Sequence, residues 1–178
     1  MLAIAPYDQD WPRQFDAEAE TLGAALGALA LRIEHVGSTS IFGLEAKPII
    51  DIQISVASLE RLEAFATPLA SVDYIHVPDP DPAFERAYPH FRKPAVGVAT
   101  RHVHLCVSGS EMERRHLAFR DYLRDHFDTA MQYASLKRDL AKANGLNSRE
   151  ARLRYTAAKG PFIESVIECA IAAGYPKR

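Results

Sequence analysis

The chain has 178 residues and a mass of 19.7 kDa, with 48% hydrophobic and 25% charged residues. These proportions are those of an ordinary globular protein, and they exclude collagen-like, low-complexity and fully disordered chains. Twenty-one basic and 23 acidic residues leave a net charge of −2, so no overall field favours nucleic acid or an anionic membrane. We therefore expect one domain over residues 1–178, in which any basic site is local.

The N-terminus and the cysteines favour a cytoplasmic protein. The opening MLAIAPYDQDWPRQF has neither the basic region nor the cleavage site of a signal peptide. Apolar runs fall far short of the roughly 20 residues that a membrane span needs. Cys106 and Cys169 show no metal-ligand spacing, so we expect two reduced, packed thiols. We predict a soluble cytoplasmic protein that does not contact membranes.

The first half of the chain predicts helices that alternate with strands. Asp10 is expected to cap a helix that begins near Trp11, where an acidic cap and an early proline suit the first turn. Strands are predicted at 31–36, 49–56 and 72–77, and a helix at 58–70. The proline-rich segment 77–89 is expected to be a surface loop.

The second half begins with a strand and continues as helices. The strand is predicted at 101–107, and the helices at 111–126, 128–143 and 149–172. Asn144 and Gly145 are expected to end the middle helix, and Ser148 to cap the last one. The charges in 111–126 are expected to form a solvated, salt-bridged helix face, with Arg120 as the exception. The fold class is α/β (α+β), with a mixed sheet and a helical C-terminal third.

Two of the predicted strands alternate between apolar and polar residues. In 49–56 the polar positions are Asp51, Gln53 and Ser55, and in 101–107 they are His102, His104 and Cys106. If the strands are neighbours, Asp51 and His104 rise from one face, and the carboxylate can orient the imidazole. The alternative is that both histidines only line a polar face under a helix. The pair His102 and His104 also resembles half of a zinc or cupin-type site, but the helical C-terminal third argues against a double-stranded barrel.

Residues 35–53 read HVGSTSIFGLEAKPIIDIQ, a pattern with a use in phosphate chemistry. Gly37 lets the backbone approach a phosphate, Ser38 can hold it, and a carboxylate on the next strand can hold Mg²⁺. Twelve residues, 39 to 50, separate Ser38 from Asp51. This resembles the signature of the nucleotidyltransferase fold, a Gly-Ser followed at about that distance by two acids. The alternative is that this Gly-Ser pair belongs to an ordinary turn without a ligand.

A narrower resemblance covers most of the chain. The blocks YDQDWPRQF, IEHVGSTSIFGLEAKPIIDI, VHLCVSGS and LAFRDYLRDH are similar, in the same order, to those of the GrpB-like proteins. YASLKRDLA and the segment with Tyr155, Lys159, Phe162 and Ile163 fit as well. These proteins are placed in the nucleotidyltransferase superfamily, so the resemblance implies that fold for 1–178.

The acids that metal-dependent transfer needs are incomplete here. Transfer uses two or three carboxylates around two metal ions, and the resemblance places Gln53 and His104 where the second and third acids belong. An amide is a poor Mg²⁺ ligand and imidazole prefers softer metals. The catalytic candidates are therefore Asp51, Gln53 and His104, and the metal candidate is a weak site at Asp51 with His104 as a second ligand. GrpB-like proteins generally share this departure.

The remaining candidates would bind the phosphates of a ligand. His35, beside the Gly-Ser turn, can donate to an anion or fill a structural role. Lys47, before the Asp51 strand, can pair with a phosphate or with Asp51, or be a solvated loop residue. Tyr133 and Lys137 share one helix face, as do Tyr155 and Lys159. The predicted phosphate or nucleotide contacts are His35, Gly37, Ser38, Thr39, Lys47, Arg101, Arg120, Tyr133, Lys137 and Lys159.

Three hypotheses follow for function. The first is a nucleotidyltransferase-like protein that binds a nucleotide or phosphorylated small molecule, and whose activity, if it has one, is Mg²⁺-dependent nucleotidyl transfer to a small hydroxyl acceptor. The second is a catalytically silent binding or regulatory module of the same fold, which Gln53 favours. The third is a metal-assisted hydrolase that uses His102 and His104. No nucleic-acid partner is expected, and the helical C-terminal third offers a face for a homodimer.

Overall fold

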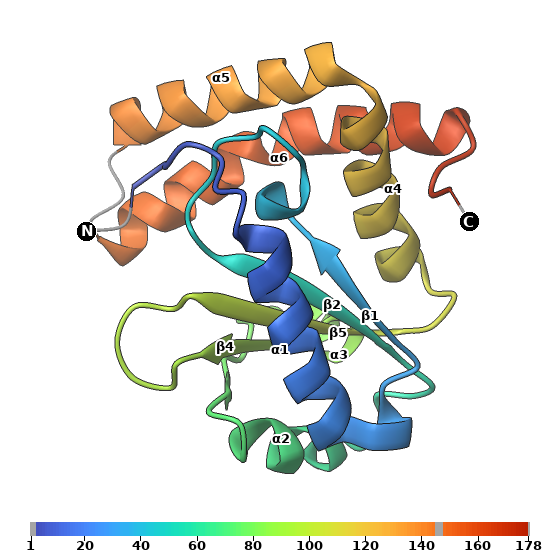
Figure 1. Ribbon diagram of the computed structural model, residues 1–178. Helices are drawn as coiled ribbons and strands as arrows, with labels where there is room; N and C mark the ends of the chain where they lie inside the picture. The colour runs from blue at the N-terminus through green and yellow to red at the C-terminus, as the bar shows by residue number, and fades with distance from the viewer. Residues whose placement is uncertain (1–2, 145–147, 178) are drawn as a thin grey trace.

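The computed structural model describes residues 3–144 and 148–177, which form a five-stranded sheet and six α-helices (Figure 1). The strands are β1 Arg32–Val36, β2 Ile50–Val56, β3 Ile75–His76, β4 His90–Lys93 and β5 Arg101–Val107. The α-helices are α1 Trp11–Leu26, α2 Glu63–Ala70, α3 Pro82–Ala87, α4 Glu111–Asp125, α5 Phe127–Asn144 and α6 Arg149–Ala172. Two short 3₁₀ turns, η1 Gly27–Leu29 and η2 Ser38–Ser40, flank β1.

The sheet is mixed and has the strand order β1-β2-β5-β4-β3. β2 and β5 run parallel at its centre, and the other neighbouring pairs run antiparallel. The register of the central pair places Asp51 opposite His102 and Gln53 opposite His104. The predicted α/β class, the mixed sheet and the helical C-terminal third are therefore confirmed.

The apolar face of the sheet carries the main core. α1 crosses this face and α2 lies at its lower edge in Figure 1. Alternate residues of β2 and β5, among them Ile52, Ile54, Val103 and Leu105, are fully buried against Leu22 of α1 and its neighbours. Because side chains alternate along a strand, burying these residues turns Asp51 and His102 to the opposite face.

The polar face lies under the C-terminal helices. Glu113 of α4 is buried and accepts hydrogen bonds from Ser55 and Arg32, and its carboxylate also accepts from the N–H of Gly109. Asp121 is buried as well. These two acids contradict the expected solvated helix face, because α4 packs its polar side onto the strands. α5 and α6, which Figure 1 shows above the sheet, contribute to a second core together with α4 and the loop after η2.

Several predicted boundaries shift. The 77–89 loop contains the short helix α3, whose first turn Asp81 caps, and the sequence reading missed β4 altogether. The helix predicted at 58–70 begins only at Glu63, and the strand predicted at 72–77 shortens to two residues. Asp10 precedes α1 without capping its backbone, since its carboxylate accepts instead from the side chain of Arg13.

Other expectations meet mixed outcomes. Ser148 caps α6 as predicted, and α5 ends at Asn144, while Gly145 lies outside the described residues. Cys106 is a buried free thiol, but Cys169 is exposed on α6, so the expectation that both thiols are packed is wrong for Cys169. Within 3–144 and 148–177, the helices are too short or too polar to cross a membrane.

The central strand should be sensitive to cavities. Ile52 is fully buried, so Ile52→Ala is expected to lower the free energy of unfolding by about 2–5 kcal/mol, measured by urea denaturation. Leu31, which is 56% exposed beside β1, provides the control. Leu31→Ala should change stability by less than about 0.5 kcal/mol. Equal losses in the two variants would contradict this assignment of the core.

Candidate functional site

A glycine turn connects β1 to the first residues of the site. Gly37 adopts φ 69° and ψ −174°, a conformation that only glycine adopts readily, and η2 begins at the next residue. A Cβ atom at Gly37 would lie 2.4 Å from Oδ2 of Asp51. The turn therefore packs its backbone directly against the side chain of Asp51, and this close approach requires glycine.

Thr39 is held in place by His35. The Thr39 hydroxyl donates to the carbonyl of Ile49 at 3.1 Å, so it accepts from Nε2 of His35 at 3.0 Å. The His35 ring stacks on Phe15, with ring centroids 4.7 Å apart. Burial lowers the pKa of His35 to about 4, which keeps the imidazole neutral. His35 therefore supports the turn and does not line the cavity beside it.

This cavity has a volume of about 200 Å³. It gathers residues from η2, the following loop, the two central strands, α5 and α6. The lining residues are Ser38, Thr39, Ala46, Lys47, Ile49, Asp51, His102, Lys137, Tyr155, Thr156 and Lys159. Six of the predicted site residues therefore meet in one place, although they span more than a hundred positions of sequence.

Three lysines dominate the charge of this cavity. The ammonium groups of Lys47 and Lys159 lie 4.4 and 4.6 Å from the ring centroid of Tyr155. Lys137 is 2% exposed, donates to the carbonyl of Glu45 and lies 4.8 Å from the ring of Tyr133. Tyr133 in turn interacts with the side chain of Ser38. Asp51 is the one carboxylate among the lining residues.

Burial and mutual repulsion lower the pKa of each lysine. Burial is the main cause for Lys137, with the charge of Lys159 next, and together they lower its pKa to about 7. Burial and Lys47 lower the pKa of Lys159 to about 8. The pKa of Lys47 is lowered by burial and by Arg152, and Asp51 offsets part of this. The cavity therefore holds more positive charge than its own carboxylate can balance.

The carboxylate of Asp51 pairs with a different histidine from the one predicted. Nδ1 of His102 lies 3.2 Å from Oδ1 of Asp51, because the β2–β5 register sets these residues side by side. His104 lies one pair further along, opposite Gln53. The expected orientation of His104 by Asp51 is therefore wrong, and the imidazole that Asp51 can orient is that of His102.

Gln53 and His104 lie deeper under the helices. The side-chain amide of Gln53 is fully buried, and neither its nitrogen nor its oxygen has a protein partner among the described residues. The His104 ring is stacked between those of His90 and Tyr88, with centroids 4.8 Å away on each side. Burial, followed by the charges of His90 and His102, lowers the pKa of His104 well below its usual value. Both predicted residues lie outside the lysine-lined cavity.

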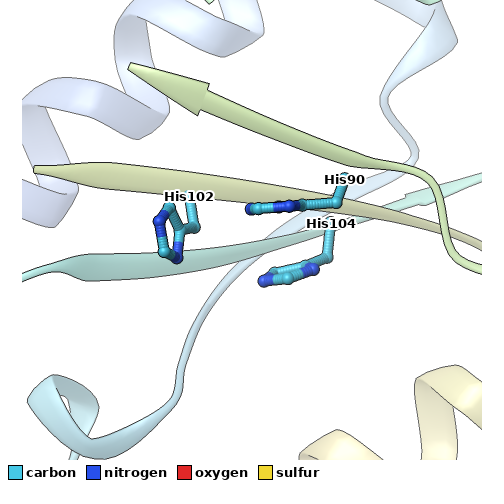
Figure 2. A group of neighbouring side chains, drawn as sticks. All are labelled: His90, His102 and His104. Carbon is cyan, nitrogen blue, oxygen red and sulfur yellow. The ribbon is translucent and has the colours of Figure 1, made fainter. Parts of the chain in front are cut away.

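His90 is a site residue that the sequence reading missed. It lies on β4 opposite His104, and its ring meets that of His102 edge-on at 4.8 Å (Figure 2). Burial and the neighbouring His102 lower its pKa to about 4. β4 was not recognised, because its four residues His90–Lys93 show no strong strand pattern. Histidines from two antiparallel strands therefore form a cluster next to Asp51.

The two predicted arginines lie outside the cavity lining. Arg101 points to the α1 side of the sheet, where its Nε lies 3.5 Å from Glu18. Arg120 is buried and bonds to Glu34 at 2.6 Å and to Asp121 at 2.7 Å, and it also donates to the carbonyl of His35. Its role is to tie α4 to β1.

A two-metal centre does not fit this residue set. Such a centre needs several carboxylates around hard cations, and Asp51 is the single acid at the turn. Gln53, in the second position, is buried away from the cavity, and its amide is a poor ligand for Mg²⁺. One Mg²⁺ held jointly by Asp51 and the phosphates of a ligand does fit, because Mg²⁺ is commonly bound through one or two carboxylates plus substrate phosphates.

Solved structures define the class of fold. A cytoplasmic RNA terminal U-transferase matches with a TM-score of 0.51 and 16% identity, over 83% of this chain and 44% of that one. The Cid1 poly(U) polymerase matches with a TM-score of 0.53 and 15% identity, over 80% and 46% of the two chains. The sheet and its helices therefore have the nucleotidyltransferase-like fold.

Closer matches define the family. The GrpB protein family profile matches residues 1–168. GrpB from Enterococcus faecalis superposes with a TM-score of 0.83 and 31% identity, over 96% of this chain and 98% of that one. A UPF0157 protein of Pseudomonas aeruginosa is 37% identical over 97% of this chain and 69% of its own length. The chain belongs to the GrpB family, as the sequence blocks predicted. It spans 39% of the length of the UPF0157 protein YqkA of Bacillus subtilis.

The close approach at the turn predicts a large effect of a single methyl group. Gly37→Ala is expected to lower the free energy of unfolding by more than the roughly 1–3 kcal/mol of backbone strain, because the methyl group also displaces Asp51. Gly43 has φ 76° and open space around its Cβ position, so Gly43→Ala should cost only the backbone strain and no side-chain clash. Urea denaturation compares the two. A smaller loss for Gly37→Ala than for Gly43→Ala would contradict the contact.

The lowered pKa of Lys137 predicts a pH-dependent stability. Between its folded pKa of about 7 and its ordinary 10.5, the unfolded chain binds more protons than the folded chain. The free energy of unfolding should therefore gain a contribution from Lys137 as the pH rises through this window. Lys137→Met should flatten the rise in urea-denaturation curves, whereas Lys142→Met, exposed on the same helix, should not. Parallel profiles for Lys137→Met and wild type would contradict the shift.

Proposed function

We propose that the cavity beside Gly37, Ser38 and Thr39 binds the phosphate groups of a nucleotide or other phosphorylated small molecule. The observation that carries the proposal is the convergence of Lys47, Lys137 and Lys159 on a glycine turn with one opposing carboxylate.

The electrostatics of the cavity favour an anion. Partly buried ammonium groups that repel one another are stabilised when a negative charge enters between them. Ser38 adds a hydroxyl and, as the first residue of η2, a backbone N–H, both of which are usual phosphate donors. A phosphate here would balance the lysines that Asp51 leaves uncompensated, so the site is built for more negative charge than the chain supplies.

The size of the cavity limits what is enclosed. About 200 Å³ lies below the roughly 300–1,000 Å³ of pockets that bury a whole drug-sized ligand. The phosphate tail therefore enters the cavity and the rest of the ligand lies outside it. A larger cavity of about 500 Å³ lies at the far ends of β2 and β5, but its charged residues are Glu60, Glu63, Glu85 and Arg86. This second cavity disfavours phosphate.

The similarities support a phosphorylated ligand. The structural neighbours with the same fold are named as uridylyl transferases, and one of them is described with dUTP bound. A relative in Mycolicibacterium paratuberculosis, 32% identical over 76% of this chain and 38% of its own length, is named dephospho-CoA kinase. We therefore place nucleoside triphosphates, coenzyme A and dephospho-CoA among the candidate ligands.

The incomplete set of carboxylates favours ligand binding over nucleotidyl transfer. Asp51 would hold one Mg²⁺ together with the ligand phosphates, and this ion would neutralise phosphate charge. The side chains of Gln53 and His104 lie away from the cavity and supply no position for a second Mg²⁺ at the ligand phosphates. A binding or regulatory module with this pocket is therefore the form of the proposal that the residues favour, and nucleotidyl transfer to a hydroxyl acceptor is its enzymatic alternative.

Thermal-shift melting tests the proposal. The four nucleoside triphosphates, coenzyme A, dephospho-CoA and inorganic triphosphate are each measured with Mg²⁺ and with EDTA. A ligand at a hundred times its Kd should stabilise the protein by about 2.7 kcal/mol. Lys159→Met should remove the shift, while Lys142→Met, on the exposed side of α5, should retain it. The absence of a shift with every ligand, in a protein that melts cooperatively, would contradict the proposal.

The same site predicts proton uptake on binding. At about pH 8, Lys137 and Lys159 are partly neutral because their pKa values are about 7 and 8. A bound phosphate raises both pKa values, so the complex takes up protons from the buffer. Calorimetric titration of inorganic triphosphate in buffers of different ionisation enthalpy measures this uptake. Uptake should decrease in Lys137→Met, and binding without uptake in the wild type would contradict the role of these lysines.

A further inference from the structure

A second group of side chains lies beside the phosphate cavity and takes no part in the proposal above. His90 of β4 and His102 and His104 of β5 each offer a ring nitrogen, and these nitrogens lie within 4.8 Å of one another. Figure 2 shows the three rings gathered on one face of the two strands, with His90 above His104 and His102 turned across them.

The backbone itself places these three rings together. His102 and His104 are two residues apart on β5, so they share a face, and the antiparallel register sets His90 directly opposite His104. Tyr88 stacks on the other side of His104, with the planes 10° apart. The cluster is therefore held by regular strand pairing and by stacking.

The nitrogens are available for a ligand. Nε2 of His90 and Nδ1 of His104 are buried and have no hydrogen-bond partner among the described residues. Buried polar atoms in native proteins are nearly always satisfied, so each orphan calls for an unseen partner.

We propose that His90, His102 and His104 form a site for a divalent transition-metal ion of the Zn²⁺ class. Imidazole suits Zn²⁺, Cu²⁺ and Ni²⁺ and not Mg²⁺ or Ca²⁺. Zn²⁺ binds imidazole nitrogen at about 2.0–2.1 Å in tetrahedral geometry, which sets two ligand nitrogens roughly 3.4 Å apart, so the rings must turn toward one ion from their present spacing of up to 4.8 Å. Three protein ligands leave a fourth position open for water or a ligand group.

Asp51 completes the arrangement. Its Oδ1 lies 3.2 Å from Nδ1 of His102, and a carboxylate at one ring nitrogen of a histidine can orient the ring while the other nitrogen, here Nε2, holds a metal. Asp51 and His102 also line the lysine cavity. The metal therefore lies next to the phosphate cavity. His90 and His104 lie outside the cavity lining, so substituting either tests the metal site without changing a residue of the phosphate cavity.

Calorimetric titration with Zn²⁺ tests the site, after dialysis against a chelator and in a Cys169→Ser background that removes the exposed thiol. We expect one ion per chain. Loss of an outer carboxylate typically costs about 10–100-fold in metal affinity, which is the loss expected for Asp51→Asn. His90→Gln and His104→Gln each remove a direct ligand and should weaken binding by more than about 100-fold. His126→Gln, between α4 and α5, is the matched control and should bind as the parent does.

Cobalt substitution checks the coordination. Co²⁺ in the parent protein should give the visible absorption of a four-coordinate site, and His90→Gln should lose it while melting as cooperatively as the parent. The proposal is overturned if the parent binds no Zn²⁺, or if His90→Gln and His104→Gln both bind it as tightly as the parent. The triphosphate thermal shift of His90→Gln in EDTA separates the two proposals. A retained shift with lost Zn²⁺ binding shows that His90 serves the metal site and not the phosphate cavity.

Discussion

The parallel pairing of β2 with β5 is the constraint on which the other features depend. One face of these strands is buried as a core of isoleucine, valine and leucine beneath α1 and α2, so the pleat turns the other residues toward α4. The register then fixes Asp51 beside His102 and His104 beside His90. A shift by one residue would move every one of these groups to the opposite face. The energy of the core therefore specifies the geometry of the polar face.

The polar face carries two groups of side chains whose charge or hydrogen-bonding capacity the described residues do not balance. At one point, lysines from the loop before β2 and from α5 and α6 surround Asp51 and exceed it in charge. Next to them, neutral imidazoles leave buried nitrogens without partners among the described residues. Neither arrangement stabilises the folded chain by itself, because burying ammonium groups in excess of carboxylate, or polar atoms without partners, costs free energy. The proposed phosphate and metal ion would supply these missing partners. Asp51 belongs to both groups and links them.

The sequence predicted the central strands and their two faces from the alternation of apolar and polar residues, and it also predicted the three C-terminal helices, the last of which Ser148 caps. It could not predict β4, whose four residues HFRK show no strong strand pattern and obtain their pairing from β5. The Gly37 turn and Asp51 were predicted to act together, and the structure brings them into contact. The pairing of Asp51 with His102 was missed, since it depends on register, which alternation alone leaves undetermined. Arg101 and Arg120 were counted as ligand contacts because nothing in their spacing reveals the partners Glu18 and Glu34.

The central claim is that the lysines of this cavity bind a phosphate group of a ligand. It is tested most directly by nitrogen-detected NMR of ¹⁵N-labelled lysine side chains, titrated with pH in the presence and absence of inorganic triphosphate. In the free protein, Lys137 and Lys159 should titrate with pKa values of about 7 and 8. Saturation with triphosphate should raise both pKa values toward that of an ordinary lysine. Two lysines that titrate identically with and without triphosphate would contradict the account.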